Sequence, residues 1–465
     1  MCETRRERDF LGELDVPADA YYGVQTQRAV ENFPISGLRA QPEFVRAMAL
    51  IKRAACTVNA EAGRLPEDVA EAIARAADEV IEGGHADQFV VDVFQAGAGT
   101  SLHMNVNEVL ANRAAELLGA ERGDYRRVHP NDHVNLGQST NDVFPTAMRL
   151  AALALLRPLL DALAQATEAF GRKAEEFGGV VKSGRTHLQD ATPLTLGQEL
   201  GGYAEALARS ADALRHAAED LRALGIGGTA VGTGVTAHAG YRQRVVEVLA
   251  ELTGESLVPA RDTFEAMQSM GPFVRLSGEM RALATELTRI CSDLRLLSSG
   301  PNTGLAEIAL PAVQPGSSIM PGKVNPVIPE CMDMICFHVI GSDLTIAMAA
   351  QAGQLELNVM MPVINLNLLG SLEIMANGLA MLAQRCVAGI TADADRCREH
   401  AHASLALATL LKTTIGYQAA SELAREAYAA GRPIGELAVE RGLMTEEDLE
   451  RLLSPEALSP DGPRA

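Results

Sequence analysis

The chain has 465 residues, 47% of them hydrophobic and 22% charged, which is the composition of a globular protein with a large core. A chain of this length favours about three domains. The formal net charge of −20, without a basic stripe, argues against nucleic acid as a partner.

The N-terminal part, residues 1–140, is predicted to be a mostly helical domain. It begins with a polar segment that lacks the apolar region of a signal peptide. No run of about 18 or more apolar residues occurs in the chain, so we expect no membrane span. The seven cysteines include no CxxC pair, and their odd number favours reduced thiols over a disulfide frame. These features together predict a cytoplasmic protein.

The central part, residues 141–395, has the clearest helical periodicity. In one segment the apolar residues alternate by four and three, and they are Leu276, Met280, Leu283, Leu287, Ile290, Leu294 and Leu297. A seam with this spacing is typical of helices that pack in bundles. Trp is absent and aromatic residues make up 4%, which favours helices over strands. We therefore predict an all-α fold with a long central helix bundle, and we expect an oligomer if apolar residues cover further helix faces.

The C-terminal part, residues 396–465, differs in character from the bundle. It is more charged, its helical patterns are shorter, and it ends in the sequence SPEALSPDGPRA. We predict a small helical domain followed by a disordered tail.

Two patterns superficially resemble ligand sites. The sequence GIGGTAVGTG at residues 225–234 fits a loose nucleotide-loop pattern, but the residues before it are helical in pattern and no βαβ unit follows. We interpret it as a tight connection between helices. Cys331 and Cys336 have no paired histidines nearby, so we interpret them as core thiols. The sequence predicts no metal ion and no organic cofactor.

The strongest local signal is PGSSIMPGKVNPVIPE, residues 315–330. Gly316 and Gly322 predict a mobile loop, and the prolines at its end suit the start of a long helix, whose N-terminus attracts anions. Lys323 adds a cation, so the segment suits a dicarboxylate. From these residues alone, a surface loop with ordinary helix capping explains the pattern equally well.

Contiguous motifs decide between these interpretations. GSSIMPGKVNP resembles the signature of the aspartase/fumarase superfamily, and the blocks at 97–113, 129–147 and 183–199 resemble that family's other motifs in order and spacing. The resemblance extends to about residue 450. It implies a dicarboxylate substrate and a homotetramer, in which five-helix bundles from four subunits form a twenty-helix core. Three subunits would then contribute to each active site.

The resemblance also implies roles for individual residues. Ser317 is expected to be the general base that removes a proton from the substrate carbon C3. Lys323 and Asn325, assisted by Thr186, are expected to hold the carboxylate beside that carbon. The remaining substrate-binding residues that the resemblance implies are Thr100, Ser101, Ser139, Thr140 and Ser318.

At the other end of the substrate, Asn141 and His187 are expected to face the leaving group. Glu330 is expected to orient His187 by a hydrogen bond, and the sequence leaves open whether His187 transfers a proton or only positions the leaving group. In fumarases the HPND block contributes a second carboxylate site, and its residues here are His129, Asn131 and Asp132.

The chemistry agrees with these roles. Removal of a C3 proton puts a second negative charge on the neighbouring carboxylate. A lysine, amides and a helix end that bind this dianion better than the substrate therefore accelerate the step. Because serine is a weak base in water, it must be activated by its local field and by closure of its loop over the substrate.

The leaving group separates the branches of the family. GAGTS at 97–101 and QSTND at 138–142 read closer to aspartases, whereas HPND and RTHLQDATPLTLGQE read like class II fumarases. We therefore predict elimination of ammonia from L-aspartate to give fumarate. The alternatives are a fumarase, a lyase for a substituted aspartate, and a non-catalytic scaffold. The chain departs from the family pattern at His103, where Asn is usual, at Asn302 and Met361, and at Lys412-Thr413, where Asn-Pro is common.

Overall fold

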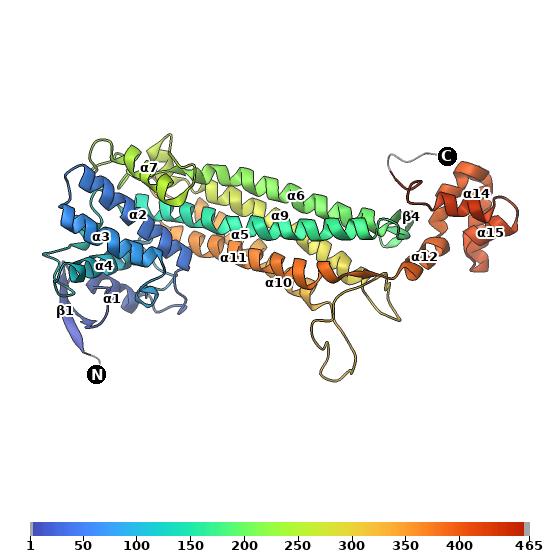
Figure 1. Cartoon of the computed structure of the whole chain (residues 1–465), viewed down its shortest axis with the longest axis horizontal. Coiled ribbons are helices and arrows are strands. Elements are labelled where there is room, and N and C mark those ends of the chain that lie inside the picture. Colours follow the sequence, from blue (N-terminus) through green and yellow to red (C-terminus); the bar gives the residue numbers. More distant parts are fainter. Residues whose placement is uncertain (1–2, 460–465) are drawn as a thin grey trace. The chain divides into compact units, whose positions relative to one another are not determined.

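The computed structural model describes residues 3–459, and helices make up most of it, as the sequence predicts (Figure 1). The chain divides into two units. The first comprises Met1–Leu159, Asp212–Ala282 and Phe337–Met375, and the second comprises Leu160–Ala211, Leu283–Cys336 and Ala376–Ala465. The division into three consecutive domains stays a prediction.

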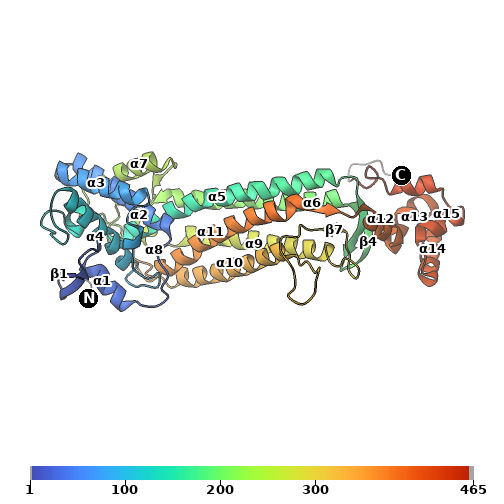
Figure 2. The same ribbon diagram turned by 60° about the horizontal axis from the view of Figure 1, so that its bottom comes forward.

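The long helices contribute residues to both units, and they are α5 (Thr140–Glu176), α6 (Leu196–Ala218), α9 (Gly271–Leu297), α10 (Val327–Gln351) and α11 (Met361–Arg385). Within each unit their segments lie side by side (Figure 1, Figure 2). The predicted seam on α9 is confirmed, because each of its seven residues is at most 4% exposed. In the second unit Tyr203 of α6 donates a hydrogen bond of 3.0 Å to Asp293 of α9. The apolar periodicity of the sequence is thus what packs these helices together.

Shorter elements complete each unit. Those of the first unit are β1 (Thr4–Asp9), β2 (Gly12–Pro17), α1 (Val24–Asn32), α2 (Pro42–Glu61), α3 (Glu67–Ile81), α4 (Thr100–Leu117), β5 (Ala223–Leu224), α7 (Tyr241–Thr253), β6 (Val258–Pro259) and α8 (Thr263–Gln268). Those of the second unit are β3 (Val181–Thr186), β4 (Gln189–Thr195), β7 (Ile308–Ala309), β8 (Thr391–Ala392), α12 (Ala394–Ala403), α13 (Ala408–Ile415), α14 (Tyr417–Ala430), α15 (Ile434–Glu440) and α16 (Glu446–Leu452). The strands pair as β1–β2, β3–β4 and β7–β8, which are antiparallel, and β5–β6, which is parallel.

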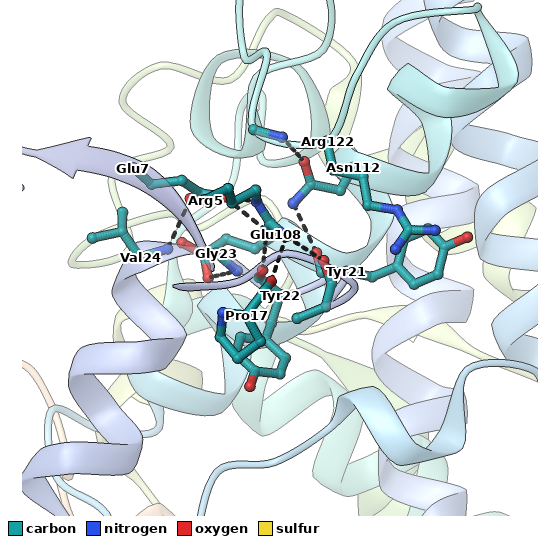
Figure 3. Close-up of polar contacts among 12 residues, drawn as sticks. Arg5, Glu7, Pro17, Tyr21, Tyr22, Gly23, Val24, Glu108, Asn112 and Arg122 are labelled. Atoms are coloured by element: carbon teal, nitrogen blue, oxygen red, sulfur yellow. Dashed lines mark hydrogen bonds and ion pairs between the residues drawn. The ribbon is translucent and has the colours of Figure 1, made fainter. Parts of the chain in front are cut away.

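A buried carboxylate fixes the start of α1 against α4 (Figure 3). Glu108 of α4 is 1% exposed and accepts hydrogen bonds from three backbone N–H groups, which belong to Gly23, Gln25 and Thr26. Burial raises the pKa of Glu108 to about 7, although these donors favour the charged form. Beside it, Arg5 donates to backbone carbonyl groups, so the hairpin β1–β2 is tied to the chain that follows it.

Among the described residues, three helices are long and apolar enough to cross a membrane by length and composition alone: Thr140–Glu176, Val327–Gln351 and Met361–Gly389. The sequence analysis looked for unbroken apolar runs and did not find these helices. In α10, for example, the charged residues Asp333 and Asp343 interrupt the apolar run. The most apolar window of α5 is 72% buried, but that of α10 is only 39% buried. α10 therefore has an apolar face that one chain leaves uncovered.

The described cysteines are free thiols. Cys336 is buried as predicted, but Cys331 is exposed, so its interpretation as a core thiol is wrong. At the C-terminal end, residues 454–459 form a turn in which the Leu458 N–H donates to the Ser454 carbonyl. The rest of the predicted disordered tail lies outside the described residues, as does Cys2.

Candidate active site

Two helices of the first unit begin beside each other. Thr100 is the first residue of α4 and Thr140 is the first residue of α5. Their hydroxyl oxygens lie 3.2 Å apart. The close approach needs a glycine before α4, because a Cβ atom on Gly99 would lie 2.1 Å from the ring of Phe144. The Thr100 hydroxyl donates to the Gly97 carbonyl at 2.7 Å, and the Thr140 hydroxyl contacts His103. Two helix N-termini that begin side by side with hydroxyl groups form a site that favours an anion.

The neighbouring predicted residues lie at the same place. Ser101 belongs to the first turn of α4, and Ser139 directly precedes α5. The Ser139 hydroxyl accepts a hydrogen bond of 3.2 Å from the Asn141 N–H, and the Asn141 side-chain amide donates to the Ala230 carbonyl at 2.8 Å. Asn141 is thus held by residue 230 of the glycine-rich loop, 225–234.

Asp142 explains what that loop does. Its carboxylate is fully buried and accepts hydrogen bonds from the N–H groups of Ser139, Gly227 and Thr229 at 2.9–3.0 Å. Burial raises the pKa of Asp142 to about 6, although the three donors oppose the shift. The loop that superficially resembled a nucleotide loop therefore binds a carboxylate of its own chain. The loop joins β5 to α7, so it is a connection, but a strand precedes it where we expected helical residues. Its contact with Asp142 was not predicted, although the acidic residue in the first turn of α5 was an available signal.

The sequence analysis also did not identify a second buried group, which lies behind this site. Lys52 of α2 is fully buried, and its Nζ lies 2.6 Å from Nε2 of His103. Nδ1 of His103 lies 2.7 Å from the Thr140 hydroxyl. A single lysine in the apolar stretch of α2 was the available signal, since buried lysines need partners.

In the second unit, Thr186 and His187 lie at the turn of the hairpin β3–β4. Thr186 pairs with Gln189, so His187 and Leu188 form a two-residue turn with φ values of 58° and 59°. Such turns normally take Asn and Gly, and a leucine with positive φ is strained. The turn places His187 at an exposed position, and strain of this kind is found at functional sites.

The base of this hairpin is fixed by a buried carboxylate. Glu307 is 0% exposed, and it contacts Nη2 of Arg185 at 2.7 Å and Nδ1 of His400 at 2.8 Å. Nζ of Lys182, on β3, lies 3.3 Å away. Burial acts to raise the pKa of Glu307, but these basic groups outweigh it and hold the pKa below its ordinary value. The hairpin is therefore anchored at one end and exposed at the other.

The predicted base lies in an irregular segment before α10. The Ser317 hydroxyl accepts hydrogen bonds from the N–H groups of Ile319 and Met320 at 3.2 and 3.0 Å. The Asn325 side-chain amide donates to the Gly316 carbonyl at 2.7 Å. These contacts lie within the loop itself, and Ser318 is exposed.

The end of the loop leads into a groove of about 1040 Å³. Lys323, Asn325 and Glu330 are among its lining residues. Within the described residues no hydrogen bond joins Glu330 to His187 in one chain, so the orienting contact between them stays a prediction.

The proposed second carboxylate site lies in the first unit. Nδ1 of His129 accepts hydrogen bonds from the backbone N–H groups of Asn131 and Asp132 at 3.2 and 3.1 Å. A neutral ring therefore carries its proton on Nε2. His129 lines a groove of about 880 Å³ together with Arg122 and Arg126. The donors suit a carboxylate, and the site stays a prediction. Across residues 3–459, His, Cys, Asp and Glu form no group of three or more that could hold a metal ion.

Comparison with known proteins places the chain in a family. A model of the lyase family matches residues 12–341, more than half of the chain, and a model of the fumarase C C-terminus matches residues 407–459. The chain belongs to the aspartase/fumarase superfamily. As a member of it, the chain has the all-α fold of the superfamily.

Two aspartate ammonia-lyases of the superfamily match almost end to end. The one from a Bacillus species is 47% identical over 99% of this chain and 98% of its own length. The one from Pseudomonas aeruginosa is 49% identical over 98% of this chain and 97% of its own. A fumarate lyase/delta crystallin from Brucella melitensis, solved with cobalt, has a TM-score of 0.95 and 49% identity over 98% of this chain and 100% of that one. A class II fumarase from Schistosoma mansoni has a TM-score of 0.93 and 38% identity over 99% and 100%.

Proposed function

We propose that the chain is an aspartate ammonia-lyase that reversibly eliminates ammonia from L-aspartate to give fumarate. The observation that carries the proposal is the meeting of the N-termini of α4 and α5, which offers hydroxyl and amide groups to one carboxylate. Identities of 45–49% with aspartate ammonia-lyases, against 38% with a class II fumarase, favour ammonia as the leaving group.

The two ends of the substrate bind to different segments. Thr100, Ser139 and Thr140 hold the carboxylate at C1, together with the positive ends of α4 and α5. Ser101 and Ser318 complete this set. Lys323 and Asn325, with Thr186, hold the carboxylate at C4, where the lysine and the start of α10 attract negative charge.

In the chemical step the Ser317 oxygen takes the proton from C3, and the electron pair of the C–H bond moves onto the C4 carboxylate. Lys323 and Asn325 stabilise this aci-carboxylate dianion more strongly than the substrate, which is the source of the rate enhancement. The dianion then collapses. A C2–C3 double bond forms, the C2–N bond breaks with its electron pair, and the protonated amine leaves as neutral ammonia.

Asn141 and His187 face the amine during this step. The contact of Asn141 with Ala230 fixes its amide, which leaves the amide oxygen free to accept from the amine. The exposed turn presents His187 outward, and Glu330 of a second copy of the chain would orient its ring.

The uncovered face of α10 supports assembly into a homotetramer with shared sites. Met334, Phe337, Leu344 and Met348 are 57–67% exposed, and with Gly341 they alternate by three and four. This is the spacing of a seam that packs against another helix. Asp333 and Asp343 are buried on the covered side of α10, so the exposed side is apolar, and its helix-packing spacing favours α10 of a second copy as the partner.

Light scattering after size exclusion tests the assembly. The wild type is expected at four times the 49.3 kDa of one chain, and Phe337→Glu is expected at a smaller mass with less activity, because a buried unpaired charge disrupts the seam. Tyr428→Glu, at a position 78% exposed on α14, is the matched control and should remain tetrameric. A wild type of one chain mass would contradict the shared-site proposal.

The reaction itself is tested by following fumarate absorbance with L-aspartate and L-malate as separate substrates. Fumarate from L-aspartate alone, with equal ammonia, supports the proposal. Fumarate from L-malate alone would make the chain a fumarase, the second candidate, which the HPND groove around His129 favours. No product from either substrate would favour a substituted aspartate or a non-catalytic scaffold.

We also place the enzyme in the cytoplasm. The free thiols of the described cysteines suit a reducing compartment. Cell fractionation followed by an activity assay tests this, and activity in a membrane or secreted fraction would contradict it.

A further inference from the structure

A buried lysine and histidine lie behind Thr140, and the mechanism above uses neither. Lys52 on α2 is 0% exposed and His103 on α4 is 1% exposed. Nζ of Lys52 lies 2.6 Å from Nε2 of His103, and Nδ1 of His103 lies 2.7 Å from Oγ1 of Thr140. The three groups form a continuous chain of hydrogen bonds that ends at the N-terminus of α5.

The other partners of Lys52 fix the direction of two of its hydrogen bonds. Nζ donates to Oδ1 of Asn135 at 2.9 Å and to Oε1 of Gln138 at 2.8 Å. The amide nitrogens of these residues donate to backbone carbonyl groups, that of Asn135 to Gln138 and that of Gln138 to Val134. Both amide oxygens therefore point at Lys52 as acceptors, and only its third position faces His103.

That third contact has two arrangements, which differ by one proton. When Lys52 is charged, it donates to Nε2, so neutral His103 carries its proton on Nδ1 and donates to Thr140. The Thr140 hydroxyl proton then points away from His103, toward a ligand or the Thr100 oxygen 3.2 Å away. When Lys52 is neutral, its lone pair accepts a proton from Nε2, and the bare Nδ1 accepts the Thr140 hydroxyl proton. Thr140 then presents only lone pairs to the ligand.

We propose that Lys52 and His103 form a proton relay that sets the direction of the Thr140 hydroxyl and thereby the affinity of the site for a carboxylate. Both are positioning residues, because they act through Thr140. A carboxylate binds the arrangement in which Lys52 is charged, so its binding draws a proton from solution whenever Lys52 is neutral. The inference rests on the proposed function only in that Thr140 binds a carboxylate.

The surroundings set the sign of the pH dependence. Burial lowers the pKa of Lys52 well below its usual value, although Asp142 on α5 opposes this. Burial and the charge of Lys52 lower the pKa of His103, so its ring stays neutral. Near Asp142, burial raises the pKa of Tyr241 on α7 and of Cys56 on α2, so both keep their protons. Carboxylate affinity is therefore full below the lowered pKa of Lys52 and falls as the pH rises through it.

Two substitutions of His103 separate the two halves of the relay. The amide nitrogen of asparagine takes the place of Nδ1, so His103→Asn keeps a donor to Thr140 without a titrating ring. The longer glutamine reaches the place of Nε2, so His103→Gln keeps the contact with Lys52 and loses the donor to Thr140. His216→Asn, at an exposed position on α6, is the matched control.

The test is calorimetric titration of the full-length protein with succinate, a dicarboxylate without an amine, at several pH values in two buffers of different ionisation enthalpy. For the wild type and His216→Asn we expect proton uptake that rises with pH, and an affinity that falls by about tenfold per pH unit above the pKa of Lys52. His103→Asn should lose most of this uptake, and its affinity should fall much less with pH than that of the wild type, because only Lys52 and Asp142 behind the site still titrate. His103→Gln should bind about tenfold more weakly at low pH.

Equal proton uptake in the wild type and His103→Asn would overturn the relay and leave the proposed function intact. A wild type that neither binds succinate nor converts L-aspartate would overturn the proposed function, and the relay with it. Thermal unfolding shows whether each variant folds. If neither His103 variant folds, the inhibition constant of succinate against wild-type turnover decides. An increase with pH supports the relay, and a constant value overturns it.

Discussion

The polar groups at the N-termini of α4 and α5 differ from those of the loop before α10 in what holds them. Behind the first set, Asp142 and Lys52 are fully buried, and each is hydrogen-bonded to residues that touch or belong to the site. In the loop, the contacts of Ser317 and Asn325 stay within the loop, and Lys323 is exposed. The difference supports our proposal that the carboxylate-binding end is formed before the substrate arrives and that the proposed base is brought in by movement of its loop.

The hairpin β3–β4 lies between these extremes. Its base is held by the buried Glu307, while its turn carries His187 into solvent. One element thus combines a buried anchor with an exposed turn, which fits the proposal that His187 contributes to a site shared with another subunit. Substitutions in the loop before α10, at the hairpin base, in the glycine-rich loop and at the helix N-termini test this difference.

The largest effect on activity is expected at the loop before α10. Ser317→Ala should lower kcat by about 10³-fold with little change in substrate affinity, because alanine cannot accept the C3 proton while the carboxylate sites remain. Steady-state kinetics with L-aspartate measure both constants. Ser318→Ala is the matched variant, and it should raise KM more than it lowers kcat. Unchanged turnover in Ser317→Ala would mean that the loop does not carry the base.

The sequence predicts the loop and the start of α10 well because their residues are consecutive, whereas the roles of the loop residues stay predictions. The block at 315–330 contains the loop, its serines and the start of α10 in unbroken order. The seam on α9 is predicted for a related reason, since its period depends only on neighbours along one helix. Contiguous patterns of this kind can be read from one sequence.

The support behind the site could not be predicted in this way. Lys52 and His103 are 51 residues apart, and Asp142 and Gly227 are 85 residues apart. These pairs exist only because α2, α4, α5 and the loop at 225–234 pack together, and tertiary packing leaves no local pattern. The face of α10 is intermediate, because its apolar composition is evident in the sequence but its exposure is not.

The second largest effect is expected at the hairpin base. Glu307→Gln should lower the free energy of unfolding by about 3 kcal/mol, because it leaves Arg185 without its charged partner and the buried Lys182 with only Glu199. The pKa of Glu307 is held below its ordinary value, so the carboxylate stabilises the fold above that ordinary value and this stabilisation is lost as the pH falls through the lowered one.

Urea unfolding at about pH 7 and about pH 4 measures this, and the wild type should lose more stability on acidification than Glu307→Gln. Glu399→Gln is the control, because Glu399 forms an exposed ion pair with Arg396 and should change stability little. If Glu307→Gln kept wild-type stability, the hairpin would not be anchored through this carboxylate.

A smaller effect is expected at the glycine-rich loop. Gly227 has a φ of +90°, and a Cβ atom there would lie 2.8 Å from that of Arg242. Gly227→Ala should therefore cost about 2 kcal/mol of stability and raise KM, because the loop holds Asp142 and Asn141. Gly240→Ala, with a φ of +85° and nothing within 4 Å, should cost about 1 kcal/mol with KM unchanged. If Gly227→Ala and Gly240→Ala lowered the stability equally, the close approach of residue 227 to Arg242 would not explain the effect.

The smallest effect is expected at the helix N-termini, where we propose that several donors share one carboxylate. Thr100→Val keeps the shape of the side chain and removes a hydroxyl that lies 3.2 Å from that of Thr140. We expect KM for L-aspartate to rise about tenfold with kcat less affected, which corresponds to the loss of one hydrogen bond to a charged group. Thr167→Val, which removes a hydroxyl bonded only within α5, is the control. A wild-type KM for Thr100→Val would mean that α4 attracts the carboxylate through its backbone alone, and the preformed end of the site would then depend on the side chains of α5.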